Sequence, residues 1–394
     1  MLRSLYAGIS GLRSHQTMLD VTGNNIANVN TTGFKVSATQ FQDTLSQMVQ
    51  GAGGPQAEAG GTNPAQVGLG VRVAGISTNF AQGAAQSTGR STDMMISGDG
   101  FFVTRLGAET LFTRAGAFDF DAEGRLVTPD GSLVQGWTAV AGAIQTGSAV
   151  GDITLPRQSV AAATPTTAAT IAGNLPADAA TGDSIVRDVP VYDTTGNAST
   201  LTMTFERTAT GWQVTGADGA TTASMDLTLA NGALTPTAPA TTLSLTIGAI
   251  VADLSGLTGY AGLTTASITG QNGRTAGTLE SFTLGKDGTL IGSFSNGAKE
   301  SIARIALANF INPGGLEKAG SSSYRATINS GAAEFSTPGT AGLGSLSGGT
   351  LEMSNVDLSQ EFTNLIVAQR GFQANARVIT TSDEVLQELT NLKR

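Results

Sequence analysis

The feature that most constrains this chain is a seven-residue apolar pattern at each of its two ends. Alternating steps of three and four residues place one narrow apolar stripe along a helix, which is typical of helices that pair as coiled coils. We predict two terminal helices that pack on each other and on neighbouring copies of the chain. The alternative is an ordinary amphipathic helix at each end, packed on its own domain. The stripe positions are Leu2, Leu5, Ile9, Leu12, Gln16, Leu19, Gly23 and Ile26 at one end, and Leu358, Phe362, Leu365, Gln369, Phe372, Ala376, Ile379, Asp383 and Leu386 at the other.

The first of these helices is expected to be weak by itself. Gly8, Gly11 and Gly23 interrupt it, and each glycine costs about 1 kcal/mol relative to alanine in a helix interior. We therefore expect the terminal helices to become ordered when they pack in an assembly.

The charge and composition of the chain exclude several classes of partner. The net charge is -9 at pH 7 and no cluster of Lys or Arg occurs, so nucleic acid and anionic membranes are not expected partners. The chain has no cysteine, which excludes disulfides and thiol nucleophiles. No apolar run reaches the ~18 residues that span a bilayer, so membrane insertion is not expected. The acid-free start, with Arg3 and Arg13, resembles a signal segment. However, the stripe continues to Ile26, so we expect a retained helix and no cleaved signal peptide.

The sequence offers little catalytic chemistry. Its single histidine, His15, lies beside the apolar stripe and is interpreted as a packing or surface residue. The Gly285–Lys286 pair fails the phosphate-loop pattern, because Glu280 and Asp287 occupy the positions of the first glycine and of the Ser or Thr. We therefore expect no catalytic residue, no cofactor and no metal site, and we predict that the protein is not an enzyme.

One acidic segment has the spacing of a calcium-binding loop. Asp119, Asp121, Glu123, Gly124 and Asp130 occupy positions 1, 3, 5, 6 and 12 of that loop. The flanking residues alternate like strands, whereas an EF-hand loop lies between helices. We favour a β-hairpin with an acid-rich turn; a calcium-binding β-domain surface protein is the alternative from a different functional class.

Between the ends, short alternating segments and glycine-containing turns predict β-strands. The predicted fold class is mixed α and β, with paired terminal helices and two nested, mainly antiparallel β domains. No βαβ rhythm appears, so a parallel sheet is not expected. Residues 33–70 are interpreted as a linker or extended segment, with a flexible Gly-rich part and a partly helical part around Phe41, Leu45, Met48 and Val49. The predicted domains are a terminal helical domain (1–32 and 353–394), an inner β domain (71–158 and 300–352) and an outer β domain (159–299).

Two motifs carry a family resemblance. Thr22–Lys35 contains T-G-N-N-I-A-N followed by G-F-K, and Ser354–Thr380 reads SNVDLSQEFTNLIVAQRGFQANARVIT. In sequence, order and terminal position these motifs resemble the bacterial flagellar rod, hook and hook-associated axial protein family. The resemblance implies that both ends lie together and that the β domains lie outside them. The motif residues are Gly23, Asn24, Asn25, Ile26, Ala27, Asn28, Gly33, Phe34 and Lys35.

The resemblance also implies a function and partners. Within the family, Val189–Gly297 resembles the outer domain of hook subunits, and a distal-rod or other basal-body protein is the alternative. A hook subunit would form a curved, hollow tube outside the cell that joins rod to filament and transmits torque as a universal joint for motility. The expected partners are further copies of this chain, rod and hook–filament junction proteins, the hook cap and the flagellar type III export apparatus.

Overall fold

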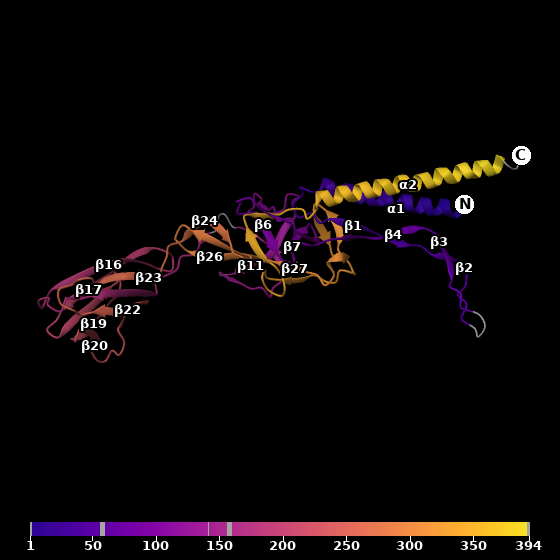
Figure 1. Cartoon of the computed structure of the whole chain (residues 1–394). Helices are drawn as coiled ribbons and strands as arrows, with labels where there is room; N and C mark the ends of the chain where they lie inside the picture. Colours follow the sequence, from indigo (N-terminus) through magenta and orange to yellow (C-terminus); the bar gives the residue numbers. More distant parts are fainter. Residues whose placement is uncertain (1, 56–59, 141, 156–159, 392–394) are drawn as a thin grey trace. The chain divides into compact units, whose positions relative to one another are not determined.

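The structure is a computed structural model of the whole chain. It describes residues 2–55, 60–140, 142–155 and 160–391, without the side chain of Leu2. Within these ranges two α-helices, α1 (Leu2–Ala27) and α2 (Leu358–Asn391), stand at the ends of a chain otherwise built mostly of β-strands (Figure 1). The prediction of two terminal helices and β-rich domains is confirmed. No helix in the described part of the chain is long and apolar enough to cross a membrane.

The chain divides into two compact units. Unit 1 comprises Met1–Leu155, Thr283–Ile291 and Ser301–Arg394, and unit 2 comprises Pro156–Phe282 and Gly292–Glu300. Both helices belong to unit 1. Three strands cross the division: β24 (Gly277–Leu284), β25 (Thr289–Phe294) and β26 (Lys299–Ile305).

Unit 1 contains many short strands. They are β1 (Ser37–Asp43), β2 (Ser46–Gln50), β3 (Ala65–Gly68), β4 (Val71–Thr78), β5 (Ala85–Ser87), β6 (Met94–Ser97), β7 (Phe101–Leu106), β8 (Glu109–Thr113), β9 (Asp119–Phe120), β10 (Leu126–Val127), β11 (Leu133–Val140), β12 (Ala143–Ile144), β13 (Gly151–Asp152), β27 (Leu307–Asn309), β28 (Glu317–Gly320), β29 (Ser323–Arg325), β30 (Glu334–Ser336), β31 (Ser345–Gly348) and β32 (Thr350–Glu352). A short 3₁₀ helix, η1 (Pro313–Gly315), precedes β28.

The main sheet of unit 1 has the order β26–β11–β7–β8–β29–β28, and β27 joins β7 to β30. β1–β4, β2–β3, β31–β6 and β32–β5 form separate two-stranded ribbons. Successive side chains of a strand point to opposite faces. Accordingly, Phe102 lies in one buried apolar cluster, whereas Phe101 and Val103 lie in another. The core of unit 1 therefore covers both faces of this sheet.

Unit 2 is built mainly on one nine-stranded sheet. Its order is β16–β17–β18–β19–β20–β22–β15–β23, with β21 also on β22, and β14 pairs with β24. Leu201, Met203 and Phe205 alternate along β17 into a buried apolar core that also contains Trp212. The strands are β14 (Val160–Ala161), β15 (Ala168–Asn174), β16 (Ser184–Tyr192), β17 (Ala198–Arg207), β18 (Gly211–Ala217), β19 (Thr222–Ala230), β20 (Ala233–Pro236), β21 (Ser244–Ile247), β22 (Ile250–Thr258) and β23 (Ser267–Gln271).

The strands of both units pair mainly antiparallel, as expected. One pair, β15 and β22, is parallel, because β16 to β21 form the long connection that a parallel pair needs. One expectation about secondary structure is wrong. The segment expected to be partly helical forms β1 and β2 instead, because Phe41 pairs across to Val73 and Met48 to Gln66. Part of the predicted flexible linker, residues 56–59, lies outside the described residues.

Candidate functional site

The two terminal helices pack side by side in opposite directions (Figure 1). A Cβ atom built on Gly8 would lie 3.5 Å from Ile379 Cγ1, and one on Gly11 would lie 2.6 Å from Asn375 Oδ1. One turn further along the pair, a Cβ on Gly371 would lie 2.5 Å from the His15 ring. A side chain at Gly11 or Gly371 would overlap a side chain of the other helix, whereas the contact at Gly8 has ordinary van der Waals length. These residues, which in sequence only weaken the helix, provide the contact.

The predicted stripe residues are not the ones buried most deeply between the helices. The buried positions of α1 are small or polar: Gly8, Gly11, Ser14, Thr22 and Asn25. His15 lies between the helices and β1, with its ring 5.7 Å from that of Phe41. The predicted stripe residues Leu5, Ile9, Leu12, Leu19, Ile26, Leu365, Phe372, Ala376, Ile379 and Leu386 are half-buried, Leu358 and Phe362 are 40% and 48% exposed, and the side chain of Leu2 lies outside the described residues.

The asparagines of the first motif close the helix and join it to other segments. Asn25 is buried; its side-chain amide donates to the Ser37 carbonyl at 2.7 Å and to Glu361 Oε2 of α2 at 3.0 Å. Its Oδ1 accepts the Ser37 backbone N–H at 3.1 Å. Asn28 donates to both oxygens of Asn24, at 2.9 and 3.1 Å. One asparagine thus connects α1, β1 and α2. Gly23 and Ala27 are exposed and Ile26 is half-buried.

The G-F-K part of the motif enters the β region through Gly33. Its φ is +67°, which favours glycine, and a Cβ there would lie 2.4 Å from the backbone nitrogen of Ala115. The Gly33 N–H donates to the Glu352 carbonyl at 2.8 Å. From the C-terminal motif, the Asn355 amide oxygen accepts the Val36 N–H at 2.8 Å. Both motifs therefore meet at the same place.

A buried charge cluster lies at this meeting point. Lys35 and Glu352 are fully buried, with Lys35 Nζ 2.6 Å from Glu352 Oε1. Arg114, also buried, lies 3.6 Å from the other carboxylate oxygen and stacks over Phe101 at 5.3 Å. Burial lowers the pKa of Lys35, and the hydrogen bond and charge of Glu352 oppose that shift. One buried carboxylate, Glu352, thus faces two buried cations, which makes it the central residue of this charge cluster.

Sequence reasoning named Lys35 as a motif residue but missed Glu352 and Arg114. Glu352 ends a short strand with no strong pattern, and it is 317 positions from its partner Lys35. The sequence feature that could have identified Glu352 and Arg114 is that each is a charged residue in a segment otherwise poor in charge. We call Asn25, Lys35, Arg114, Glu352 and Glu361 together the terminal joint.

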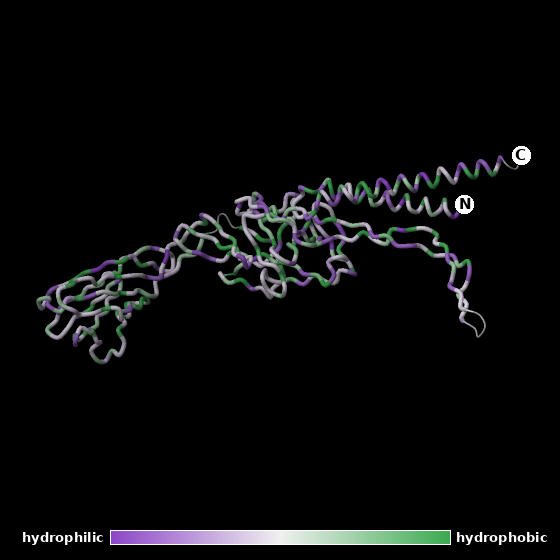
Figure 2. The backbone as a smooth tube through the Cα atoms, viewed as in Figure 1, coloured by the Kyte–Doolittle hydropathy of each residue, from purple (hydrophilic) through white to green (hydrophobic). Residues whose placement is uncertain are grey.

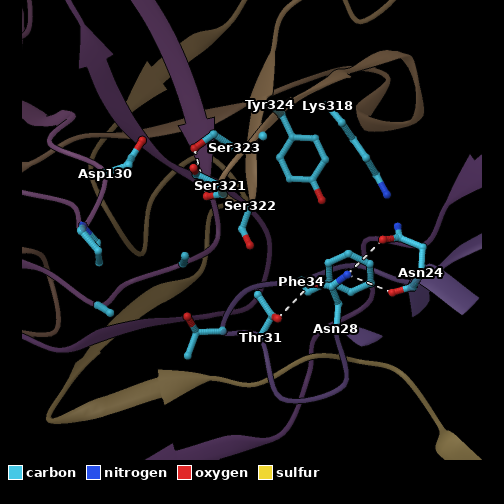
Figure 3. Close-up of a pocket in the computed structure, with 15 residues that line it drawn as sticks. Asn24, Asn28, Thr31, Phe34, Asp130, Lys318, Ser321, Ser322, Ser323 and Tyr324 are labelled. Carbon is cyan, nitrogen blue, oxygen red and sulfur yellow. Dashed lines mark hydrogen bonds between the residues drawn. The ribbon is translucent and has the colours of Figure 1, made fainter. Parts of the chain in front are cut away.

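A cavity of about 640 Å³ lies beside the terminal joint (Figure 3). Phe34 forms one wall, and Lys318 and Tyr324 of β28 and β29 form another. Lys318 Nζ donates to Ser37 Oγ at 2.7 Å and lies 5.2 Å from the centre of the Phe34 ring. Burial raises the pKa of Tyr324 to about 12, so its hydroxyl remains a hydrogen-bond donor at neutral pH. These contacts fix the motif against the main sheet.

The acidic segment forms a hairpin, as favoured. β9 pairs with β10, with Leu126 opposite Phe120. Asp121 accepts the Glu123 and Arg125 N–H groups and pairs with the Arg125 side chain at 2.7 Å. Among the described residues, no group of three or more His, Cys, Asp or Glu side chains is arranged to hold a metal ion.

Comparison with known proteins places the chain in a family. Family models match residues 5–35 (flagella basal body rod protein), 95–172 (flagellar hook protein FlgE/F/G D1 domain) and 347–392 (flagellar basal body rod FlgEFG protein C-terminal). The flagellar hook protein FlgE of Borreliella burgdorferi is 40% identical over 442 residues, covering 100% of both chains. This chain belongs to the flagellar hook and rod protein family.

The similar proteins include both hook proteins and rod proteins. The flagellar basal-body rod protein FlgG of Bacillus subtilis is 34% identical, again over 100% of both chains. The solved flagellar hook protein FlgE2 of Helicobacter pylori is 14% identical, covers 68% of this chain and 100% of its own, and has a TM-score of 0.48. The terminal joint draws Asn25 and Lys35 from the first family region and Glu352 and Glu361 from the last. The two family regions therefore act together in the folded chain.

Proposed function

We propose that this chain is a structural subunit of the bacterial flagellar hook. The observation that carries the proposal is the full-length similarity to a hook protein, 40% identical from end to end. The second candidate is a rod subunit, which the full-length similarity to a rod protein at 34% favours less. As a hook subunit, the chain would polymerise with its own copies and act as a structural part of the motility apparatus outside the cell.

In the polymer, residues 1–32 and 353–394 form an inner tube of paired helices. The half-buried stripe from Leu5 to Ile26 and from Leu365 to Leu386 completes its packing against neighbouring copies. Head-to-tail contacts whose rotation does not close give such a helical assembly. Residues 71–158 and 300–352 form the inner β domain, residues 159–299 form the outer one, and residues 33–70 connect the helices to them.

The terminal joint supports a mechanical role for this arrangement. A hook that transmits torque as a universal joint must pass force from its inner tube to its outer domains. Asn25 and the Lys35–Glu352 pair link both helices to the strands through short, buried contacts. Such contacts hold the helix pair in one orientation on unit 1. The rod, the hook–filament junction, the hook cap and the export apparatus, which would deliver the chain without a cleaved signal peptide, are the further proposed partners.

Deletion of this gene in the source bacterium tests the assignment. Electron microscopy of isolated basal bodies should show complete rods without hooks, and the intact gene supplied in trans should restore curved hooks and swimming. Basal bodies with incomplete rods would instead identify a rod subunit. Normal hooks in the deletion strain would contradict both candidates.

A further inference from the structure

The cavity beside the terminal joint contains hydrogen-bond donors that nothing in the described part of the chain uses. Lys318 Nζ donates to Ser37 Oγ at 2.7 Å and pairs with no carboxylate among the described residues, so two of its three N–H groups remain. Within the same residues, neither the Tyr324 hydroxyl nor the amide nitrogen of Asn24 has an acceptor. Figure 3 shows the ends of Lys318 and Tyr324 pointing into one space, with Asn24 on its other side.

The acceptors around this space, in contrast, are already occupied. Asn28 donates to both oxygens of Asn24, at 2.9 and 3.1 Å, and its own Oδ1 accepts the Thr31 hydroxyl at 3.0 Å. The two carboxylate oxygens of Asp130 accept hydroxyl groups of its own turn. The cavity therefore has donors to offer and few acceptors, and an excess of donors around a cation selects an anion.

The rest of the cavity wall is apolar. Hydrophobic and hydrophilic residues follow one another closely along the backbone of unit 1 (Figure 2), and the cavity wall is likewise mixed. Phe34, Ala115, Ala117 and Pro129 supply its apolar part. A volume of about 640 Å³ lies within the range of about 300–1,000 Å³ that small-molecule pockets have. An anionic group alone would leave most of this space unfilled, so the ligand needs an apolar body as well.

The turn that borders the cavity is unusual. Ser321 and Ser322 connect β28 to β29, and their φ angles are +49° and +55°. A two-residue turn of this kind favours asparagine and glycine, because other residues are strained there. Both serines line the cavity. Strained residues of this type cluster at ligand-binding sites, which supports a ligand in this position.

We propose that this cavity binds a small monocarboxylate with a flat apolar body, with the carboxylate on Lys318 and Tyr324 and the body against Phe34. Lys318 is the one cation among the lining residues, and Asp130 adds a negative charge. A second negative charge on the ligand would therefore have no partner, which disfavours phosphate esters. Desolvation lowers the pKa of Lys318 with no carboxylate to oppose the shift, and the ligand would supply one.

The site goes beyond the proposed function and does not depend on it. All the lining residues belong to unit 1, so the site is complete within one chain. A bound carboxylate would connect the first motif, through Phe34 and Asn24, to β28 and β29 of the main sheet. Since a ligand that binds only the folded state stabilises that state, it should raise the melting temperature of unit 1 and leave unit 2 unchanged.

Benzoate and benzamide test the proposal on the unpolymerised full-length chain. The two probes have the same flat shape, and only benzoate carries a charge. Ligand-observed NMR titrations at one ionic strength should show benzoate binding at least tenfold more tightly than benzamide. Phenyl phosphate, mostly dianionic at neutral pH, should bind more weakly than benzoate. Calorimetry should show the benzoate-dependent rise of the unit 1 transition.

Variants of Lys318 locate the site. Lys318→Met should weaken benzoate binding by about tenfold, to the level of benzamide, whereas Lys318→Arg should keep it within about threefold of the parent. Tyr324→Phe, which retains the ring and removes the hydroxyl, should weaken benzoate binding by about threefold. Lys286→Met is the matched control, because Lys286 is an exposed lysine of unit 1 outside the cavity, and it should bind like the parent.

Several results would overturn the proposal. The cavity is not a carboxylate site if the parent binds neither probe, or binds both equally. If Lys318→Met, with a normal unit 1 transition, still prefers benzoate, the ligand binds elsewhere. Tighter binding of phenyl phosphate than of benzoate would contradict the monocarboxylate class. None of these results would affect the proposed hook function, which the deletion strain tests separately.

Discussion

The core of unit 2 and the terminal helix pair differ in how their apolar side chains are used. In unit 2, Trp212, Phe205 and Leu201 are fully buried among strands that belong to the same sheet. In the helix pair, α1 has no buried large apolar side chain among those described, and Ala368 is the only buried apolar residue of α2. Unit 2 completes its core within one chain, whereas the helix pair leaves its apolar stripe half-covered.

The two regions differ in when the free energy of apolar burial is obtained. Burying apolar surface contributes about 25 cal/mol per Å². In unit 2 this contribution is obtained when the chain folds. On the half-covered stripe, part of this contribution would be obtained only in the proposed polymer, when a neighbour packs against the helices. A change on the stripe should therefore affect assembly, and a change in a β core or at the terminal joint should affect folding.

Ile9→Asp is the change with the largest expected effect. Ile9 is half-buried on the stripe, so an aspartate there would place a charge in a contact with the next copy, where it would be desolvated without a partner. We expect complete loss of polymers, measured by sedimentation and electron microscopy. The thermal transitions of the β units should remain unchanged.

Ile328→Asp is the matched control, because Ile328 is a fully exposed isoleucine of unit 1 outside the helices. It should polymerise like the parent chain. If Ile9→Asp polymerises normally, or if both variants fail equally, the helix pair has no special part in assembly and the contrast with unit 2 is lost.

Glu352→Gln should have the next largest effect, and this effect should be on the folding stability of unit 1. Loss of the Glu352 charge leaves the buried Lys35 without its ion-pair partner and removes the nearer carboxylate from Arg114, and breaking a buried ion pair in this way costs roughly 3–5 kcal/mol. Lys35→Met should cost less, because Glu352 then keeps Arg114. Calorimetry should show a lower transition for unit 1 and an unchanged one for unit 2. Glu317→Gln, at a largely exposed carboxylate, is the control, and an equally small effect of Glu352→Gln would contradict the role of the joint.

The existence of the terminal helices could be predicted from sequence because spacing is a local signal. The stripe from Leu5 to Ile26 depends only on residues three and four apart, and the strands of unit 2 depend on alternation. The motif from Gly23 to Lys35 was also visible, but its purpose was not. Asn25 and Lys35 act on Glu361 and Glu352, more than 300 residues away, and no local pattern encodes such a pair.

The glycines show a second limit of the sequence. Gly8 and Gly11 were interpreted by their helix propensity, as weak points. In the folded chain a Cβ on Gly11 would overlap the Asn375 side chain of α2, and Gly8 lies in contact with Ile379, so the same residues that weaken an isolated helix lie where the two helices meet. Similarly, Phe41 and Met48 were assigned to a partial helix, because their strand partners come from a later segment of the chain.

Unit 2 should respond to acid through Asp193, a smaller effect confined to its own fold. Hydrogen bonds from the Thr195 hydroxyl and the Asn197 backbone lower the pKa of Asp193 from 3.8 to about 2. The unfolded chain therefore binds a proton more readily, and the stabilisation present above pH 3.8 is lost as the pH falls to about 2. Asp193→Asn should flatten this part of the pH profile of the unit 2 melting temperature. An unchanged profile would contradict the assignment.

Calcium should have no effect on the melting temperature. The acids of the β9–β10 hairpin and the following turn already have partners: Asp119 pairs with Arg90 at 3.2 Å, Asp121 with Arg125 at 2.7 Å, and Asp130 accepts the Ser132 hydroxyl at 3.0 Å. A cation would have to displace an arginine, and strands flank the segment where an EF-hand has helices. Calcium at about 5 mM, above the ~10⁻⁴–10⁻³ M range of extracellular calcium modules, should leave the melting temperature unchanged in both the parent and Asp121→Asn. If calcium raised the melting temperature of the parent but not that of Asp121→Asn, the hairpin would bind calcium. The hairpin, like the helix pair, would then be completed by a partner outside the chain.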